Sequence, residues 1–446
     1  MFPDELWQGR FHLIRRLGLN ILVDGETGAI YELDKVAGDA FLSGKFSSAP
    51  EIEEEFRQVL SISGKERIEE ASRELEESPR LPRAMCLHVA EDCNLACKYC
   101  FRGDATRKKL RMHVEDARDA VDFLLSMPNR SIELDYFGGE PLLNWPLLEE
   151  VIPYAIKRAK EEGKSIKQAL TSNCILLDEK KLKFLCDHEV SLTLSLDGPP
   201  HIHDRFRVTE DGKGSWHKVF PNLIRAVRYG RDVCVRGTYT RETINFADTV
   251  RFLVEEAGIK ILSLEPVTGY GEWGITDSDL DEIEKQYEKL AVYYDNMRKD
   301  GRSFDFYHFR LPLYNFPCLE KRMIGCGAGA EYLALGADGY IYPCHRFVSN
   351  KDWIMGKVKE PVWETDIHRK FRRNSWIKNP VCSSCWARLF CGGGCPASRY
   401  EANGDIDRLD ELSCSIFKLR LEFAIVLEIL RIKNQVSYMT ETVTVS

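Results

Sequence analysis

The sequence lacks the features that would place the protein in a membrane, outside the cell or on nucleic acid. No apolar run approaches the roughly 18 to 20 residues of a membrane span. The first residues, MFPDELWQGRFHLIRR, lack the basic-then-apolar order of a signal peptide. The net charge of −8 gives no basic footprint for a nucleic acid. We therefore expect a cytoplasmic protein that binds neither nucleic acid nor a membrane.

The chain is instead rich in cysteine, with fifteen among 446 residues. A long chain without a signal peptide is not expected to depend on disulfides, and an odd number argues against complete pairing. Reduced thiolates that bind metal or serve redox catalysis are the leading interpretations. The length allows two or three domains with a sizeable core.

Residues 1–80 form the first compositional unit. The segment 12–33 predicts two β-strands around a turn, with Asp24-Gly25 and Thr27-Gly28 as turn residues. Three helices are expected to follow, over residues 34–44, 49–62 and 64–78. This order predicts a small winged-helix-like domain. The acidic character of its helices disfavours DNA as a partner.

Residues 84–310 follow a linker with two prolines and alternate strands with amphipathic helices. The strands are expected at residues 84–90, 132–138, 167–173, 190–198, 233–240 and 260–267. Six such βα units predict an α/β fold in which a parallel sheet curls into a partial (β/α)6, TIM-like barrel. In barrels of this kind the chemistry lies at the C-terminal ends of the strands.

Residues 311–446 contain short strands, glycines and eight of the cysteines, and end in a helix expected at 416–430. Little of this region could form a core by apolar burial alone. We therefore expect a domain organised by metal.

Three cysteines, Cys93, Cys97 and Cys100, follow the first barrel strand directly. Thiolates select iron–sulfur clusters or zinc, but a structural zinc site needs four protein ligands and no fourth is paired with this loop. Three cysteines would leave one iron of a four-iron cluster open to another ligand. The spacing CxxxCxxC followed by Phe101 resembles the signature of radical S-adenosylmethionine (SAM) enzymes.

The resemblance extends to the ends of the later strands. Gly138, Gly139 and Glu140 resemble the family motif whose backbone and glutamate meet the methionine ammonium of SAM. Further SAM contacts are implied at Asn173, Ser195, Asp197, Arg207 and Arg236, with Ser195 and Arg236 directed at ribose or carboxylate. Each of these residues alone could instead be a polar group that caps a helix. The resemblance implies reductive cleavage of SAM to a radical that abstracts a substrate hydrogen.

The downstream cysteines resemble, spacing for spacing, the SPASM domain of peptide-modifying radical SAM enzymes. That resemblance implies two auxiliary [4Fe–4S] clusters in addition to the radical cluster, three in all. The outer cluster would be held by Cys382, Cys385, Cys391 and Cys414, and the inner one by Cys326, Cys344 and Cys395. Cys318 is the candidate fourth ligand of the inner cluster, but that iron could also stay open for a substrate thiolate. A buried free thiol at Cys318 and zinc as the metal are the alternatives.

The remaining four cysteines, Cys86, Cys174, Cys186 and Cys234, fall on apolar strand or helix segments and are expected to be small core residues. No metal role is expected for the histidines. His345, next to Cys344, could tune a cluster through a hydrogen bond.

Over nearly its full length the chain resembles the thioether-forming maturases, including those of SCIFF peptides and other ranthipeptides. The segments that carry this resemblance include VRGTYTR, SLEPV, YHF and CGGGCPASRY. It implies C–S bond formation in a ribosomally made precursor peptide whose leader adds to the sheet of residues 1–80, with flavodoxin or ferredoxin as electron donor. The alternatives are formylglycine formation on a sulfatase, a C–C crosslink, or a leader-binding scaffold without turnover.

Overall fold

The computed structural model describes residues 9–44, 50–78, 80–103, 109–229, 233–269, 271–311, 323–360 and 365–443. Cys318 lies outside these residues. The strands are β1 (Phe11–Arg16), β2 (Leu19–Asp24), β3 (Ile30–Leu33), β4 (Ala84–Ala90), β5 (Ser131–Gly138), β6 (Ser165–Ser172), β7 (Ser191–Ser195), β8 (Val233–Tyr239), β9 (Ile261–Pro266), β10 (Asp305–Phe306), β11 (Tyr332–Leu335), β12 (Tyr340–Tyr342) and β13 (Gly356–Lys357). The helices are α1 (Lys35–Ser43), α2 (Pro50–Ser61), α3 (Lys65–Glu77), α4 (Val114–Ser126), α5 (Trp145–Glu161), α6 (Glu179–Asp187), α7 (Pro200–Phe206), α8 (Trp216–Arg228), α9 (Phe246–Glu255), α10 (Leu280–Lys299), α12 (Asp366–Arg372), α13 (Pro380–Ser383), α14 (Arg388–Cys391), α15 (Pro396–Asn403) and α16 (Glu411–Val443).

The N-terminal sheet has three antiparallel strands, not the two that the sequence predicts. Leu17 and Gly18 both have positive φ, 48° and 78°, and turn the chain between β1 and β2. Two such residues make the tight turn whose twist matches a hairpin. Leucine seldom adopts a positive φ and so gives no turn signal. For this reason the sequence alone predicts one strand before Asp24. The expected turn at residues 24–28 joins β2 to β3 instead.

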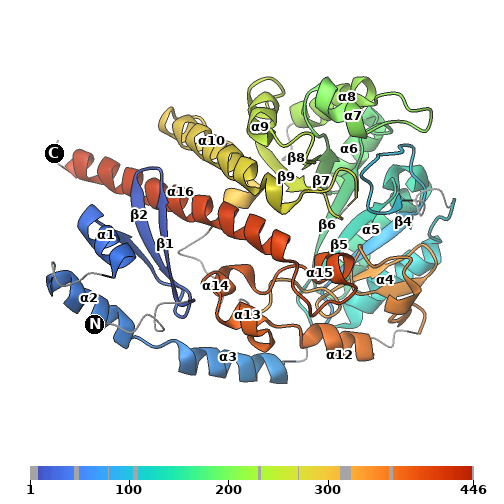
Figure 1. The fold of residues 1–446 in the computed structure, drawn as a ribbon. Helices are drawn as coiled ribbons and strands as arrows, with labels where there is room; N and C mark the ends of the chain where they lie inside the picture. The colour runs from blue at the N-terminus through green and yellow to red at the C-terminus, as the bar shows by residue number, and fades with distance from the viewer. Residues whose placement is uncertain are drawn as a thin grey trace.

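The three helices predicted after this sheet are confirmed as α1, α2 and α3. Asp34 starts α1 by accepting a hydrogen bond from the Ala37 N–H at 2.7 Å. One part of the sheet packs on α1 and α2, and another packs on α16 and residues 385–390. Figure 1 shows α16 running alongside β1 and β2.

The central sheet has the order β10-β9-β8-β7-β6-β5-β4-β11-β12-β13. The strands β4 to β9 are all parallel to their neighbours, which confirms the six predicted barrel strands and their βα order. Among the strands that the structure describes, β10 and β13 each pair on one side only, so the barrel is partial. At one end β11 pairs parallel with β4, so a strand from the cysteine-rich region extends the same sheet.

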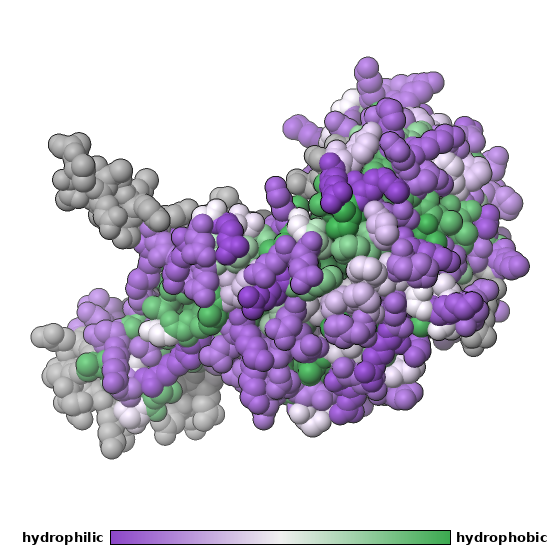
Figure 2. All heavy atoms as spheres, turned by 90° about the horizontal axis from the view of Figure 1, so that it is seen from above, coloured by the Kyte–Doolittle hydropathy of each residue, from purple (hydrophilic) through white to green (hydrophobic). Residues whose placement is uncertain are grey.

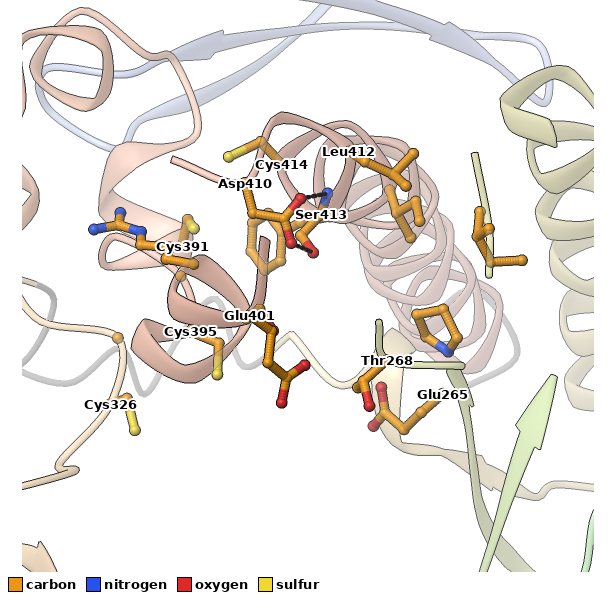
Figure 3. Close-up of a pocket in the computed structure, with 18 of the residues that line it drawn as sticks. Glu265, Thr268, Cys326, Cys391, Cys395, Glu401, Asp410, Leu412, Ser413 and Cys414 are labelled. Atoms are coloured by element: carbon orange, nitrogen blue, oxygen red, sulfur yellow. Dashed lines mark hydrogen bonds between the residues drawn. The ribbon is translucent and has the colours of Figure 1, made fainter. Parts of the chain in front are cut away.

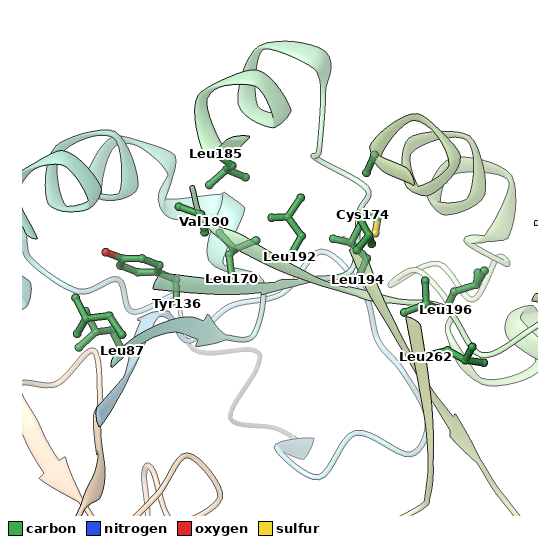
Figure 4. Packing of buried hydrophobic residues seen from close by; sticks show 14 of the residues in the cluster. Leu87, Tyr136, Leu170, Cys174, Leu185, Val190, Leu192, Leu194, Leu196 and Leu262 are labelled. Atoms are coloured by element: carbon green, nitrogen blue, oxygen red, sulfur yellow. The ribbon is translucent and has the colours of Figure 1, made fainter. Parts of the chain in front are cut away.

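The core lies between this sheet and the helices that cover its outer face. All seven residues of β4 are buried, whereas β5 alternates buried and half-buried residues with the period of two of a strand. In Figure 4, Leu170 and Leu192 point from the sheet toward Leu185 of α6. This packing holds the strand ends, and therefore the loops after them, in fixed positions.

The C-terminal region is built from short elements and ends in the long α16, which begins and ends beyond the predicted range 416–430. Among the described helices, none is both long and apolar enough to span a bilayer. The face of the molecule in Figure 2 is largely hydrophilic, with smaller apolar patches.

Candidate functional site

The three-cysteine loop after β4 is held by backbone hydrogen bonds to a distant segment. The N–H groups of Ala96 and Lys98 donate to the carbonyls of Val208 and Phe206 at 2.7 and 2.9 Å. The side chain of Leu95 is buried beneath the loop. The positions of the thiols are therefore set by the protein and not by the loop alone.

Glycines at the end of β5 let this loop pass close to the strand. A Cβ at Gly138 would lie 2.1 Å from the carbonyl oxygen of Ala90, and one at Gly139 would lie 2.2 Å from that of Asp92. The Gly139 N–H donates to Ala90 O at 2.8 Å. Only glycine fits these positions, so the Gly-Gly pair sets the spacing between the cysteine loop and β5.

Glu140 lies behind the cavity wall and is completely buried. Its carboxylate accepts hydrogen bonds from the Leu142 N–H at 3.1 Å, the Ser172 hydroxyl at 2.8 Å and the Asn173 N–H at 2.8 Å. Burial raises the pKa of Glu140 to about 7 in spite of these bonds. The carboxylate thus ties the ends of β5 and β6 together, while the backbone of Gly138 and Gly139 lines the cavity.

A cavity of about 420 Å³ lies over the strand ends, with the three cysteines in its wall. Four of the predicted SAM contacts also line it: Asn173, Ser195, Arg207 and Arg236. Ser195 and Arg236 are neighbours because they are paired residues on β7 and β8. The Asn173 side chain lies against the cysteine loop, with its Nδ2 2.7 Å from Asn94 Oδ1 and 3.7 Å from Cys93 Sγ.

Asp197 is buried and acts as the hub that fixes the cysteine loop on the barrel. It accepts hydrogen bonds from Arg207 Nε and the Thr238 N–H, both at 3.0 Å, and from the Tyr99 hydroxyl. Tyr99 stands between Cys97 and Cys100, and sequence reasoning missed it. Asp197 and Arg207 therefore position the loop, and Arg207 also faces the cavity.

A second buried group anchors the far end of the loop. Arg102, two residues after Cys100, forms an ion pair with Glu91 and lies 2.8 Å from His88 Nδ1. Glu91 in turn lies 3.5 Å from the backbone N–H of Ala337, which follows β11. The loop is thus connected to the cysteine-rich region as well as to the barrel.

The cysteine-rich region brings its thiols together in two sets. After burial, the nearby thiols of Cys326 and Cys395 raise the pKa of Cys344, so these three cysteines form one set. In the same way, Cys382 and Cys385 raise the pKa of Cys391, and Cys391 and Cys382 raise that of Cys414, so these four form a second set. We call these the inner set and the outer set. They are the groups that the sequence predicts as two sets of ligands, except for Cys318.

The thiols in all three places suit iron–sulfur clusters. Burial raises the pKa of Cys93 to about 12 and of Cys344 to about 12, so a positive metal is needed to keep them as thiolates. No group of three or more His, Cys, Asp or Glu side chains in the described part of the chain is arranged around a single metal ion. A four-iron cluster does not require that arrangement, because each thiolate binds a different iron.

Glycines and arginines hold the two sets in place. A Cβ at Gly392, which has φ of 63°, would lie 2.3 Å from the backbone N of Gly325, so the segments that carry Cys391 and Cys326 touch. Arg346 lies 3.5 Å from Cys395 Sγ. Arg399 is buried and its guanidinium lies 3.8 Å from Cys382 Sγ. Such donors favour sulfur in its anionic, metal-bound form.

A second cavity, of about 440 Å³, extends from the cysteine sets to the barrel. Figure 3 shows Cys326, Cys391 and Cys395 on one side of it and Glu265 and Thr268 on the other. The two cavities share five wall residues: Arg236, Glu265, Pro266, Val267 and Thr268. We call the cavity over the strand ends the SAM-side cavity and the second cavity the cysteine-side cavity. The two are neighbours across one short segment at the end of β9.

Glu265 on this shared wall was not among the predicted site residues. Burial raises its pKa, but His308, Arg236 and Arg420 outweigh burial and lower the pKa to about 2. Its Oε1 lies 3.3 Å from His308 Nε2. In the sequence, the segments SLEPV and YHF, which carry Glu265 and His308, only support a family resemblance, and the contact between the two residues is not visible there.

The four cysteines outside the three-cysteine loop and the two sets lie away from both cavities. Cys86 and Cys174 are buried, as predicted for core thiols, while Cys186 and Cys234 are half-buried. None of the four lines either cavity.

Comparisons with known proteins agree with this architecture. The model of the radical SAM superfamily matches residues 87–253, and the model of the SPASM iron–sulfur cluster-binding domain matches residues 326–386. The chain is 25% identical over 362 residues to a cysteine-type anaerobic sulfatase-maturating enzyme of Clostridium perfringens, covering 75% of this chain and 94% of the relative. It is 23% identical over 363 residues to the radical SAM cyclopropyl synthase TigE of Paramaledivibacter caminithermalis, covering 76% and 72%.

Solved structures share the fold. The structure of anSMEcpe with bound AdoMet and the Cp18Cys peptide aligns with a TM-score of 0.67 at 22% identity, covering 80% of this chain and 99% of that one. Streptococcus suis SuiB bound to its precursor peptide SuiA aligns with a TM-score of 0.55 at 16% identity, covering 91% and 98%.

The fold and the two matched domains define a radical SAM partial barrel joined to a SPASM domain. Residues 87–253 therefore match the radical SAM superfamily and residues 326–386 the SPASM iron–sulfur cluster-binding domain, and the chain is similar in sequence to the anaerobic sulfatase-maturating enzymes and TigE and in fold to SuiB. The match to the radical SAM superfamily indicates SAM and a [4Fe–4S] cluster as the cofactors of residues 87–253.

Proposed function

We propose that this enzyme modifies a ribosomally made precursor peptide by linking a cysteine sulfur to a carbon of another residue. The observation that carries the proposal is the wall shared by the two cavities. One part of a peptide can lie over the strand ends while a nearby thiol lies against the inner set. A thioether needs a carbon at the radical site beside a substrate sulfur, and the inner set would bind that sulfur or take away the surplus electron.

In this proposal, Cys93, Cys97 and Cys100 hold the radical cluster, and the outer and inner sets hold two auxiliary clusters. Total iron would then be about twelve per chain. Gly138, Gly139, Asn173, Ser195, Arg207 and Arg236 would surround SAM, while Glu140 and Asp197 hold the wall and the loop in place. When bound, the radical cluster supplies the electron that cleaves SAM into a hydrogen-abstracting radical.

The net change on the peptide replaces one C–H and one S–H bond by a C–S bond. The hydrogen atom ends on the adenosyl fragment of SAM, and the thiol proton goes to solvent. The remaining electron needs an acceptor, which the iron–sulfur groups held by the inner and outer sets would supply. The inner set has two exposed cysteines, Cys326 and Cys395, which supports access of a substrate thiol.

Residues 1–80 are proposed as the leader-recognition domain, of winged-helix-like form, with residues 84–310 as the radical SAM domain and 311–446 as the SPASM domain. The N-terminal sheet presents β3 as an edge strand, which an extended leader can join by backbone hydrogen bonds. SuiB and anSMEcpe have each been solved with a bound peptide, and this supports a peptide substrate here.

The test is anaerobic turnover with the precursor peptide encoded beside the gene. We expect 5′-deoxyadenosine and a product that has lost two hydrogens and has one thiol per crosslink protected from alkylation. A C–C crosslink would also remove two hydrogens but leave every thiol reactive. Formylglycine formation would remove sulfur and leave an aldehyde. No 5′-deoxyadenosine under reducing conditions would mean a scaffold without turnover.

A further inference from the structure

A groove lined by cationic side chains lies beside the outer set. Two adjoining hollows, of about 630 and 290 Å³, share Arg369, Arg373, Ser375 and Lys378 in their walls. They extend from α12 to α3. We call these two hollows together the basic groove.

The charges of the basic groove oppose the overall charge of the protein. Six cationic side chains line it, against three carboxylates: Arg369, Lys370, Arg372, Arg373, Lys378 and Arg399 against Asp366, Asp407 and Glu76. Arg373 is exposed and forms no ion pair within the described ranges. Lys378 is paired with Glu76 at 3.4 Å, but both side chains are about half-exposed, and such pairs are weak. The groove is therefore a local positive patch on a chain of net charge −8.

One side of the basic groove reaches the outer set directly. Arg399 lines both the groove and the cysteine-side cavity, and its guanidinium lies 3.8 Å from Cys382 Sγ. Asn379, also in the groove wall, accepts a hydrogen bond from the backbone N–H of Cys382 at 3.2 Å. Val381, directly before Cys382, is 65% exposed and adds an apolar contact point. A protein seated in the groove would therefore lie one side chain away from Cys382.

We propose that the basic groove is the docking site for a small acidic one-electron carrier protein, such as a flavodoxin. The inference rests on the proposed function, because it takes the outer set to be a redox site. An acidic carrier is repelled by a protein of net charge −8 and needs a positive face to approach. On docking, the reduced carrier would lose one electron, and the iron–sulfur cluster that the outer set would hold at Cys382 would gain it.

The test compares two charge-reversed variants of the reconstituted enzyme. The first is R373E combined with K378E in the basic groove. The matched control is K157E combined with K180E on α5 and α6, whose lysines are 76% and 85% exposed. The probe is a purified oxidised flavodoxin, titrated by calorimetry at low and at physiological salt.

We expect the groove variant to raise the flavodoxin Kd by about tenfold or more and to flatten its salt dependence, with the control close to wild type. Flavodoxin-driven cleavage of SAM should fall in parallel, while dithionite-driven cleavage stays at the wild-type rate. An unchanged flavodoxin Kd overturns the proposal. A weaker precursor-peptide affinity with unchanged flavodoxin binding also overturns it and assigns the groove to the substrate. Absence of dithionite-driven cleavage in the wild type would instead contradict the proposed function.

Discussion

Glu422 of α16 accepts a hydrogen bond from Arg16 Nε of β1 at 2.6 Å, across 406 residues of sequence. His12 Nε2 lies 2.8 Å from the other oxygen of the same carboxylate. Arg16 also pairs with Glu284 of α10 at 2.7 Å. Because α16 carries Cys414 near its start, one helix connects the N-terminal sheet to the outer set. The proposed leader site and the proposed redox site are thus mechanically joined.

Replacing Glu422 by glutamine should weaken this junction in a pH-dependent way. Burial raises the pKa of Glu422, but hydrogen bonds from His12 and Arg16 outweigh burial and lower the pKa. The stabilisation is therefore present above the unfolded pKa of about 4.3 and is lost as pH falls through the lower folded pKa. We expect E422Q to reduce the free energy of unfolding by about 2 kcal/mol at pH 7.

The measurement is anaerobic urea unfolding followed by far-UV circular dichroism. E284Q is the control, since Glu284 is 41% exposed and its loss should matter less. The difference between E422Q and wild type should shrink once the pH is below about 4. An effect of equal size at pH 7 and at low pH would show that charge is not what holds the junction.

Gly139→Ala should displace the cysteine loop. The new Cβ would lie 2.2 Å from Asp92 O, and neither backbone segment can move without breaking its hydrogen bonds. Overpacking of this kind costs about 1–3 kcal/mol, so SAM affinity should fall by about tenfold or more. Gly271→Ala is the control, because nothing lies within 4 Å of its Cβ. If G139A keeps the SAM affinity and iron content of the wild type, the backbone at Gly139 does not lie as close to Asp92 as the structure shows.

Asp197→Asn should loosen the same loop by a different route. The substitution keeps the size of the side chain but leaves the half-buried Arg207 guanidinium without its carboxylate, which costs about 3 kcal/mol. Tyr99→Phe removes only one hydrogen bond to Asp197 and should cost about 1 kcal/mol. Thermal unfolding midpoints and iron retention after gel filtration measure the difference. If D197N and Y99F lower the unfolding midpoint and the iron content equally, Asp197 does not fix the cysteine loop through more than its bond to Tyr99.

Glu32→Pro should weaken leader binding without removing a bond within the N-terminal sheet. Along two antiparallel strands, hydrogen-bonded and non-hydrogen-bonded residue pairs alternate. The Asp24 N–H donates to Ala29 O at 2.9 Å, so these two residues form a hydrogen-bonded pair. Glu32, three residues further along β3, is then in a non-hydrogen-bonded pair, and its N–H points away from β2. Proline removes that outward donor and is tolerated at a sheet edge.

Glu32→Ala is the matched control, since it loses the same carboxylate but keeps the N–H. Fluorescence anisotropy with a labelled precursor should show a higher Kd for E32P than for E32A. The same Kd for both variants would show that the leader does not add to β3 at this position.

The regular parts of the barrel could be predicted because their signal is local. Strand β5 alternates buried and half-buried residues, and β4 is a continuous apolar run, so both are readable over seven or eight residues. The turn at Leu17 and Gly18 was missed because its first residue carries no turn signal. There the surrounding sheet imposes a positive φ that leucine does not favour.

The site was predictable only in part, because only some of its residues carry a signal in their local sequence. Cysteine and glycine spacings reveal the loops, since each such residue has a narrow chemical or steric use. Tyr99 and Glu265 were missed because an ordinary tyrosine or glutamate gains its role from partners far away in the chain. The Glu265–His308 contact, for example, joins the end of β9 to a residue just after β10.

By itself, the sequence determined the number and spacing of the thiols, the order of the six barrel strands and the place of the first cysteine loop after β4. These properties follow from residue type and from periodicity over short stretches. Only the tertiary structure decided that two cavities share the wall at Glu265, that Asp197 holds the cysteine loop, and that Glu422 joins the first strand to the last helix. Those relationships arise from packing between elements that are distant in sequence, and local composition does not encode such distances.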